Sequence, residues 1–492
     1  MVHAFINYSK TLLTPLFLLM FAISTLININ FTVLRSIRNT LTVADLGGSA
    51  ALLPYFELLG AAPGAILITA FITWLIGKYP LQKVFCYTMA LFLGFYATFA
   101  FAIYPFLAGL KQQLLSLPHF PLQAILAEYL VPFVSMMFYA MAELWKVAIY
   151  SVLFCALINQ YLSLSEAKKY YAPLTLGTSI GAMLAGSVIA TCTSETTASL
   201  LSINQMAWKH SFYLLITAIC IIGCITALLF YQLWRKLSIQ KPTTFLNTEQ
   251  SSFHKKNLSL RECISTCWRS PYLLLMAIIV SGDYIAYSLG EVIILDVFKL
   301  HYPDPKQYCQ FMGKLSTWGG ALTFVSALFI APWLFARFRW VVSSVVTPVC
   351  LLLTGGPFII AVCFKDSWPV SLEAAGIHWL ALCVLFGAAQ FVLCRSTKYT
   401  LFDSSKELAF VHLASDEKIK GKLVIDGICS RLGKGSSSLL SILLIRLFGS
   451  PIGSALLTGV ISMTFTLAWI GATFRLGKMV DGKGLQPAHD SA

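Results

Sequence analysis

The chain has 492 residues, of which 58% are hydrophobic and 11% are charged, and its formal net charge is +14. Soluble globular domains carry about 25% charged residues, so this composition excludes an ordinary soluble protein. The positive charge does not indicate a nucleic-acid partner, because the cytoplasmic loops of membrane proteins collect Lys and Arg.

Apolar stretches recur from one end of the chain to the other, and many reach the roughly 20 residues that cross a bilayer core. The first of them is too long for the core of a cleavable signal peptide. We therefore predict an all-α integral membrane protein embedded in a lipid bilayer. Its twelve predicted spans are 11–36, 50–76, 84–108, 124–158, 170–191, 211–234, 271–297, 316–336, 340–363, 376–394, 423–447 and 451–475.

One polar, basic loop divides these spans into two sets of six. This is the layout of major-facilitator-type transporters, whose halves are related by an axis along the membrane normal. The layout predicts a six-helix half over 1–234, a basic cytoplasmic linker over 235–270, a second six-helix half over 271–475 and a cytoplasmic tail over 476–492.

Lys and Arg are concentrated in alternate loops, those that follow the even-numbered spans. Because such loops face the cytoplasm, this pattern puts both termini there and supports an even number of spans. The residues that carry it are Lys78, Lys83, Lys168, Lys169, Arg337, Arg339, Arg475 and Lys478, together with the central loop and the stretch from Arg395 to Lys422.

Ionisable residues inside predicted spans are costly in lipid and mark candidate functional sites. Arg38 lies near the end of the first span, and Glu143 and Lys146 lie three residues apart in the fourth. Two further sets repeat every four residues and so share a helix face. These sets are Asp283, Tyr287 and Glu291 in the seventh span, and Lys422 with Asp426 in the eleventh.

These charges suit an anionic cargo, because guanidinium and ammonium groups bind phosphate oxygens. The carboxylates would hold the cations when the site is empty, alternate between ion pairs, or take up a proton, and Tyr287 would stack on a base. The alternative is structural: Glu143 with Lys146, or a Glu with an Arg of another span, ties helices together, and Tyr287 is an ordinary packed aromatic. Both interpretations remain open at this point.

The sequence contains no motif that indicates an enzymatic or a metal-binding function. The thirteen cysteines form no CxxC pair, the His residues are dispersed, and Gly433-Lys434-Gly435 is no phosphate-binding loop because it lacks the required spacing and hydroxyl residue. We therefore expect no cofactor, no metal and no enzymatic activity.

Several motifs are spread over nearly the whole chain, and the two most specific are 138–145 (FYAMAELW) and 420–434. Together they resemble the ATP/ADP translocases of plastids and obligate intracellular bacteria. The resemblance implies twelve spans and nucleotide transport, often ATP in exchange for ADP, and for a bacterial member the inner membrane. Positions important in that family fall at Arg38, Glu143, Glu291, Lys420 and Lys422.

The chain also departs from that family. Asn39 stands where an Asp is usual, Leu295 and Val297 replace lysines that often follow Glu291, and Lys146 replaces a small residue. ATP/ADP exchange is the leading prediction. Proton-coupled uptake of other nucleotides, NAD/ADP exchange and antiport of smaller phosphorylated metabolites are the competing hypotheses.

Overall fold

This computed structural model describes residues 14–46, 48–107, 109, 121–161, 164–200, 206–240, 260–368, 376 and 378–484. All of the regular secondary structure within these residues is helical. Twelve helical segments within these residues are long and apolar enough to cross a membrane, which confirms the predicted fold class. They are Pro15–Val43, Ala50–Ile76, Leu81–Leu107, Tyr129–Gln160, Leu174–Cys192, Trp208–Ile239, Pro271–His301, Pro305–Arg337, Trp340–Cys363, Trp379–Val411, Glu417–Phe448 and Ala455–Val480.

The three largest errors in the predicted spans arise where helix continues through polar residues that suggested a loop. The first span runs to Val43 rather than 36, the eighth begins at Pro305 rather than 316, and the tenth runs to Val411 rather than 394. Some polar side chains in these extensions form ion pairs with other parts of the protein, among them Lys306, Arg395 and Lys398.

The predicted linker and tail are partly helical. Residues 241–259 and 485–492 lie outside the described residues, and the predicted loop also contains the helix Leu260–Arg269. The last helix continues to Gly484. The division of the chain at 234, 270 and 475 stays a prediction.

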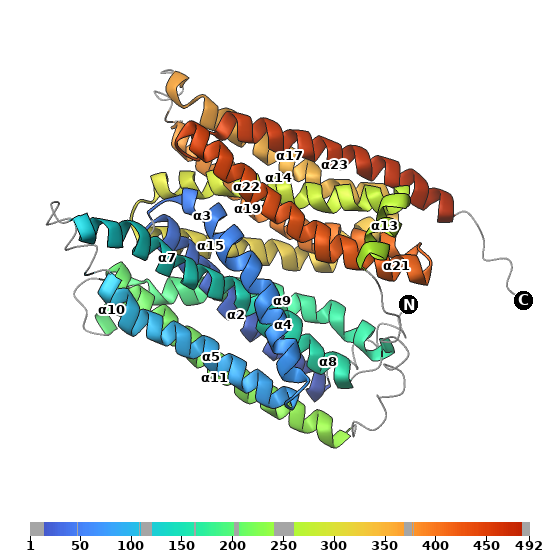
Figure 1. Cartoon of the computed structure of the whole chain (residues 1–492), viewed down its shortest axis with the longest axis horizontal. Coiled ribbons are helices and arrows are strands. Elements are labelled where there is room, and N and C mark those ends of the chain that lie inside the picture. The colour runs from blue at the N-terminus through green and yellow to red at the C-terminus, as the bar shows by residue number, and fades with distance from the viewer. Residues whose placement is uncertain are drawn as a thin grey trace, which may run out of the picture. The chain divides into compact units, whose positions relative to one another are not determined.

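The chain forms two compact units, and unit 1 comprises Met1–Leu52, Leu59–Lys255 and Tyr302–Ala321. Figure 1 shows α5 and α11 side by side in it. Its helices are α2 (Pro15–Val43), η1 (Ala50–Leu52), α4 (Ala62–Ile76), α5 (Leu81–Thr98), η3 (Phe99–Ile103), α7 (Pro121–Trp145), η4 (Lys146–Phe154), α8 (Cys155–Tyr161), α9 (Leu164–Cys192), α10 (Glu195–Leu200), α11 (Trp208–Gln240) and most of α15 (Pro305–Val325).

Unit 2 comprises Leu53–Leu58, Lys256–His301 and Leu322–Ala492. Within it, α14 packs against α19, α22 and α23. Its helices are α3 (Leu53–Tyr55), the start of η2 (Phe56–Ala61), α13 (Leu260–Arg269), α14 (Pro271–His301), η6 (Ser326–Ile330), α16 (Ala331–Arg337), α17 (Trp340–Cys363), η7 (Lys365–Ser367), α19 (Trp379–Thr397), η8 (Lys398–Phe402), α20 (Asp403–Val411), α21 (Ser415–Lys422), η9 (Leu423–Cys429), α22 (Ser430–Phe448) and α23 (Ala455–Gly484).

Helix α2 is the central element of unit 1 and packs against α7, α9 and α11. Its buried polar side chains donate hydrogen bonds to backbone carbonyls, as Asn30 Nδ2 does to Ile219 O at 3.1 Å. In return, Trp145 Nε1 donates to Ile27 O at 3.1 Å. Satisfying such groups inside the protein is what allows polar residues in a helix that crosses lipid.

Helices α9 and α15 approach each other closely through glycines. A Cβ on Gly320 would lie 2.7 Å from Ser179 O and 2.8 Å from Met183 N, which are backbone atoms of α9. On the neighbouring residue Gly319, a Cβ would meet nothing within 4 Å. Small residues of this kind let transmembrane backbones come together.

We expect Gly320→Ala to destabilise the protein by about 1–3 kcal/mol, because the added methyl overlaps backbone that cannot rotate away. Gly319→Ala is the matched control and should be neutral or stabilising by up to ~1 kcal/mol, since Ala is the better helix former. The apparent melting temperatures of the two purified variants measure the difference. Equal melting temperatures would show that the contact is not tight.

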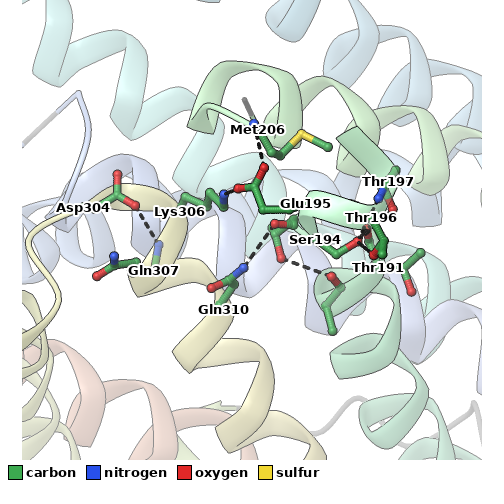
Figure 2. Close-up of polar contacts among 12 residues, drawn as sticks. Thr191, Ser194, Glu195, Thr196, Thr197, Met206, Asp304, Lys306, Gln307 and Gln310 are labelled. Atoms are coloured by element: carbon green, nitrogen blue, oxygen red, sulfur yellow. Dashed lines mark hydrogen bonds and ion pairs between the residues drawn. The ribbon is translucent and has the colours of Figure 1, made fainter. Parts of the chain in front are cut away.

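A polar contact joins α10 to the first turn of α15 in unit 1. Figure 2 shows Glu195 between Lys306, with which it forms an ion pair, and the backbone of Met206, whose N–H donates to Glu195 Oε2 at 3.2 Å. The hydrogen bond from Lys306 holds the pKa of Glu195 below its usual value. Gln310 Nε2 donates to Thr193 O at 3.1 Å, so two side chains fix this end of α15.

The short segment 53–58 belongs to unit 2 because its polar residues bind α22. Lys434 Nζ lies 2.7 Å from Glu57 Oε1, and Arg446 Nε donates to the Tyr55 hydroxyl at 3.0 Å. The start of the second span therefore packs with the eleventh.

Candidate functional site

Arg38 and Glu143 form an ion pair in unit 1, between α2 and α7. Arg38 is 4% exposed, and its guanidinium carbon lies 4.3 Å from the centre of the Tyr139 ring. Tyr139 and Glu143 are four residues apart on α7, so one helix face supplies both the carboxylate and the aromatic. The structure thus brings together two predicted site residues that are 105 positions apart in the chain.

Lys146 begins the π-helical segment η4, directly after the turn that carries Glu143. Its Nζ lies 5.1 Å from the centre of the Phe31 ring on α2. Wide π-helical turns often mark functional sites, because they shift the side-chain register of a helix. Here the shift in side-chain register begins at Lys146, three residues after Glu143.

Asp283 and Lys398 form the most buried ion pair of unit 2 among its described residues. Asp283 is 2% exposed, and Lys398 Nζ lies 4.1 Å from the centre of the Tyr284 ring. Eight residues further along α14, Glu291 Oε1 lies 3.5 Å from Arg395 Nη2. Two predicted carboxylates of the seventh span therefore pair with two cations of the tenth.

Tyr287 packs against the hydrophobic core cluster of unit 2. The packed-aromatic interpretation accounts for this position, and a role in stacking on a base stays a prediction.

A polar cavity of about 350 Å³ lies in unit 2, within the range of small-molecule sites. Lys406 lines it and is held by Asp426 at 2.8 Å and by Asp403 at 3.9 Å. Asp426, which the sequence places on one helix face with Lys422, is therefore paired with Lys406 of the tenth span. The other lining residues are Val280, Tyr284, Phe402, Glu407 and Ser430.

Lys420 and Lys422 bind different carboxylates. Lys422 Nζ lies 2.7 Å from Glu407 Oε2, and the two side chains are 44% and 50% exposed. Lys420 Nζ lies 2.6 Å from Glu262 Oε1 on α13, and Lys420 is buried. Of these two cations, Lys422 is the one that solvent reaches.

Sequence reasoning missed three cations of the tenth span, namely Arg395, Lys398 and Lys406. They were assigned to a cytoplasmic loop because the predicted span ended at 394. Their spacing was the available signal, since positions three, four or eight residues apart return to one helix face. Continuing that face past 394 would have placed all three on one helical stripe.

The family model and the similar proteins of known name agree on one family. Residues 3–480 match the sequence model of the TLC ATP/ADP transporter family. The chain is 31% identical over 476 residues to ADP,ATP carrier protein 1 of Chlamydia muridarum, covering 94% of this chain and 88% of that one. It is 29% identical over 449 residues to the chloroplastic ADP,ATP carrier protein 1 of Arabidopsis thaliana, covering 90% and 70%.

Solved structures agree on the fold. A bacterial homologue of the iron transporter ferroportin, in an inward-facing state, aligns with a TM-score of 0.58 at 14% identity, over 94% of this chain and 99% of the other. A nucleoside transporter aligns with a TM-score of 0.55 at 13% identity and the same coverage. At such low identity these matches establish the helical transporter fold alone.

Proposed function

This chain belongs to the TLC ATP/ADP transporter family, and we propose that it exchanges ATP for ADP across a membrane by displacing carboxylates from its intramembrane cations. It is a multi-pass membrane transporter and not an enzyme. No reaction step is needed: the cargo has only to enter, bind and leave.

The observation that carries this proposal is that cations within the spans are held by carboxylates of other helices. Arg38 has Glu143, Lys398 has Asp283, and Lys406 has Asp426. A nucleotide phosphate offers the same acceptor oxygens with more charge, so it can replace a carboxylate at a cation and keep that cation paired.

Binding in which a phosphate replaces a carboxylate at a cation also suits transport. A cation that is already paired when the site is empty costs little to keep inside the bilayer, and the released carboxylate restores the pair once the cargo leaves. Arg38 is best suited to grip phosphate, since its planar guanidinium can bind two oxygens at once. Lys422, which is exposed, is best suited to meet the nucleotide first.

We assign Glu143, Asp283, Glu291 and Asp426 to coupling, and we retain Lys146 as a substrate-binding candidate. Lys420 is reassigned from the substrate to the contact with Glu262, because it is buried beside that carboxylate. The distribution of Lys and Arg supports cytoplasmic termini, and bacterial relatives support a bacterial inner membrane.

Exchange is tested with purified protein in liposomes that contain or lack internal ADP. We expect uptake of radiolabelled ATP to depend on internal ADP and to persist when an uncoupler removes the proton gradient. Uptake that ignores internal ADP and collapses with the uncoupler would establish proton symport instead. Competition by NAD, by a different nucleotide or by a sugar phosphate, but not by ADP, would identify the competing compound as the cargo.

A further inference from the structure

Helix α13 lies at a defined depth because of its place in the chain. It covers Leu260–Arg269, and Ser270 alone separates it from α14, the seventh span, which begins at Pro271. Ten residues are too few to cross a bilayer. Its last turn therefore lies where the seventh span enters the membrane, at the level of the lipid headgroups.

One face of α13 is fixed by packing within unit 2. Figure 1 shows α13 beside α21, and the helix also contacts α14 and η9. Cys263 and Cys267, four residues apart, are buried in the hydrophobic cluster there. Burial raises the pKa of the Cys267 thiol to about 11, so this thiol stays neutral at cellular pH.

A second face of α13 is apolar and exposed. Ile264 is 47% exposed and Trp268 is 77% exposed, and their spacing of four residues puts them on one side of the helix. Trp is enriched at membrane–water interfaces, where its ring sits at headgroup level. Both the residue types and the depth of the helix fit burial among lipid headgroups.

The third face of α13 carries exposed cations. Arg261 lies next to the Ile264–Trp268 stripe, and Arg269 lies about 100° beyond it beside the exposed Glu262, on the side away from the buried cysteines, since successive residues are 100° apart around a helix. An apolar stripe bordered by arginines is the pattern of helices that lie in the plane of the interface and attract anionic lipids.

We propose that α13 binds anionic phospholipid at the membrane surface through Arg261, Arg269 and the Ile264–Trp268 stripe, and that this binding adjusts transport through the Glu262–Lys420 pair. Glu262 lies on α13, and Lys420 lies on α21, two residues before Lys422. A shift of α13 toward lipid moves Glu262, and with it the helix that carries Lys422. The regulatory part rests on the proposed exchange function, whereas the lipid contact does not.

The lipid contact is tested in nanodiscs of phosphatidylcholine with increasing phosphatidylglycerol. Quenching of Trp268 by brominated phospholipid, taken as the wild-type signal minus that of Trp268→Phe, should rise with phosphatidylglycerol. Arg261→Gln and Arg269→Gln should each require about fivefold more anionic lipid, the ratio implied by ~1 kcal/mol per basic residue near such a surface. Arg337→Gln with Arg339→Gln is the matched control, because these two exposed arginines lie at the end of the eighth span and just before the ninth.

The regulatory step is tested with ATP/ADP exchange in the same lipids. We expect phosphatidylglycerol to change the exchange rate of the wild type, and Glu262→Gln to flatten this dependence while Trp268 quenching persists. Trp268 quenching that is absent, or that Arg337→Gln with Arg339→Gln weakens as much as the α13 variants, would overturn the lipid contact. An exchange rate that follows phosphatidylglycerol equally in Glu262→Gln would overturn the coupling. Absence of exchange in every lipid would instead count against the proposed function.

Discussion

Arg38→Gln should reduce ATP/ADP exchange by about 10- to 100-fold, the loss expected when a charge-assisted contact worth ~1.5–3 kcal/mol is removed. The guanidinium is buried between Glu143 and the Tyr139 ring. Arg38→Lys should recover part of the activity, because it restores the charge but not the planar, two-pronged geometry.

A variant of Glu143, the partner of Arg38, distinguishes an effect on nucleotide binding from an effect on turnover. Glu143→Gln keeps the shape but removes the charge that competes with phosphate for Arg38. We therefore expect an unchanged or lower KM for ATP together with a strongly reduced maximal rate, because the empty site can no longer neutralise Arg38 for its return. Initial rates of exchange over a range of external ATP concentrations give both constants.

Because Arg38 is paired with Glu143, its loss should also lower the stability of the folded protein. Truncating one member of a paired, buried set leaves the other charge uncompensated. Arg38→Gln should lower the melting temperature, and Arg38→Gln with Glu143→Gln should restore it without restoring exchange. Arg446→Gln, which removes a cation hydrogen-bonded to Tyr55, is the control. Normal exchange by an inserted Arg38→Gln protein would remove Arg38 from the site.

The number of spans could be predicted because it follows from composition and length, which do not depend on tertiary contacts. The ends of the spans could not. The first turn of α15 contains Lys306 and Gln307, and hydropathy assigns such residues to a loop. In the fold, Lys306 binds Glu195 and Asp304 Oδ2 accepts a hydrogen bond from Gln307 N at 3.2 Å, so the polar start of the span is satisfied by the protein.

The members of the candidate site were predicted better than their partners. Arg38, Glu143 and Asp283 are recognisable because a charge in an apolar span is costly. Sequence spacing relates residues on one helix, so it suggests Lys146 as an ion-pair partner for Glu143 but cannot name an Arg on another helix. The observed pairs join different helices: Arg38 with Glu143 across 105 positions, and Asp283 with Lys398 across 115. Such pairs depend on how the helices pack, which no single-helix pattern records.

The pair of Asp283 with Lys398 should be the most sensitive to loss of one member. Lys398→Gln leaves the Asp283 carboxylate, which is 2% exposed, without its cation, and removing one partner of a buried pair costs roughly 3–5 kcal/mol. Asp283→Asn should be similarly harmful, because it strands the Lys398 ammonium over the Tyr284 ring. We expect both variants to melt at clearly lower temperature than the wild type.

The double variant Asp283→Asn with Lys398→Gln removes both charges and should recover most of the lost stability. Lys422→Gln with Glu407→Gln is the control in the same unit, where both side chains are about half exposed and the pair should contribute little to stability. If Lys398 also meets the cargo phosphate, the stable double variant will remain inactive in exchange. If the double variant transports normally, the pair is a structural tie between α14 and the tenth span, and the cations that bind the nucleotide are to be sought at Arg38, Lys406 and Lys422.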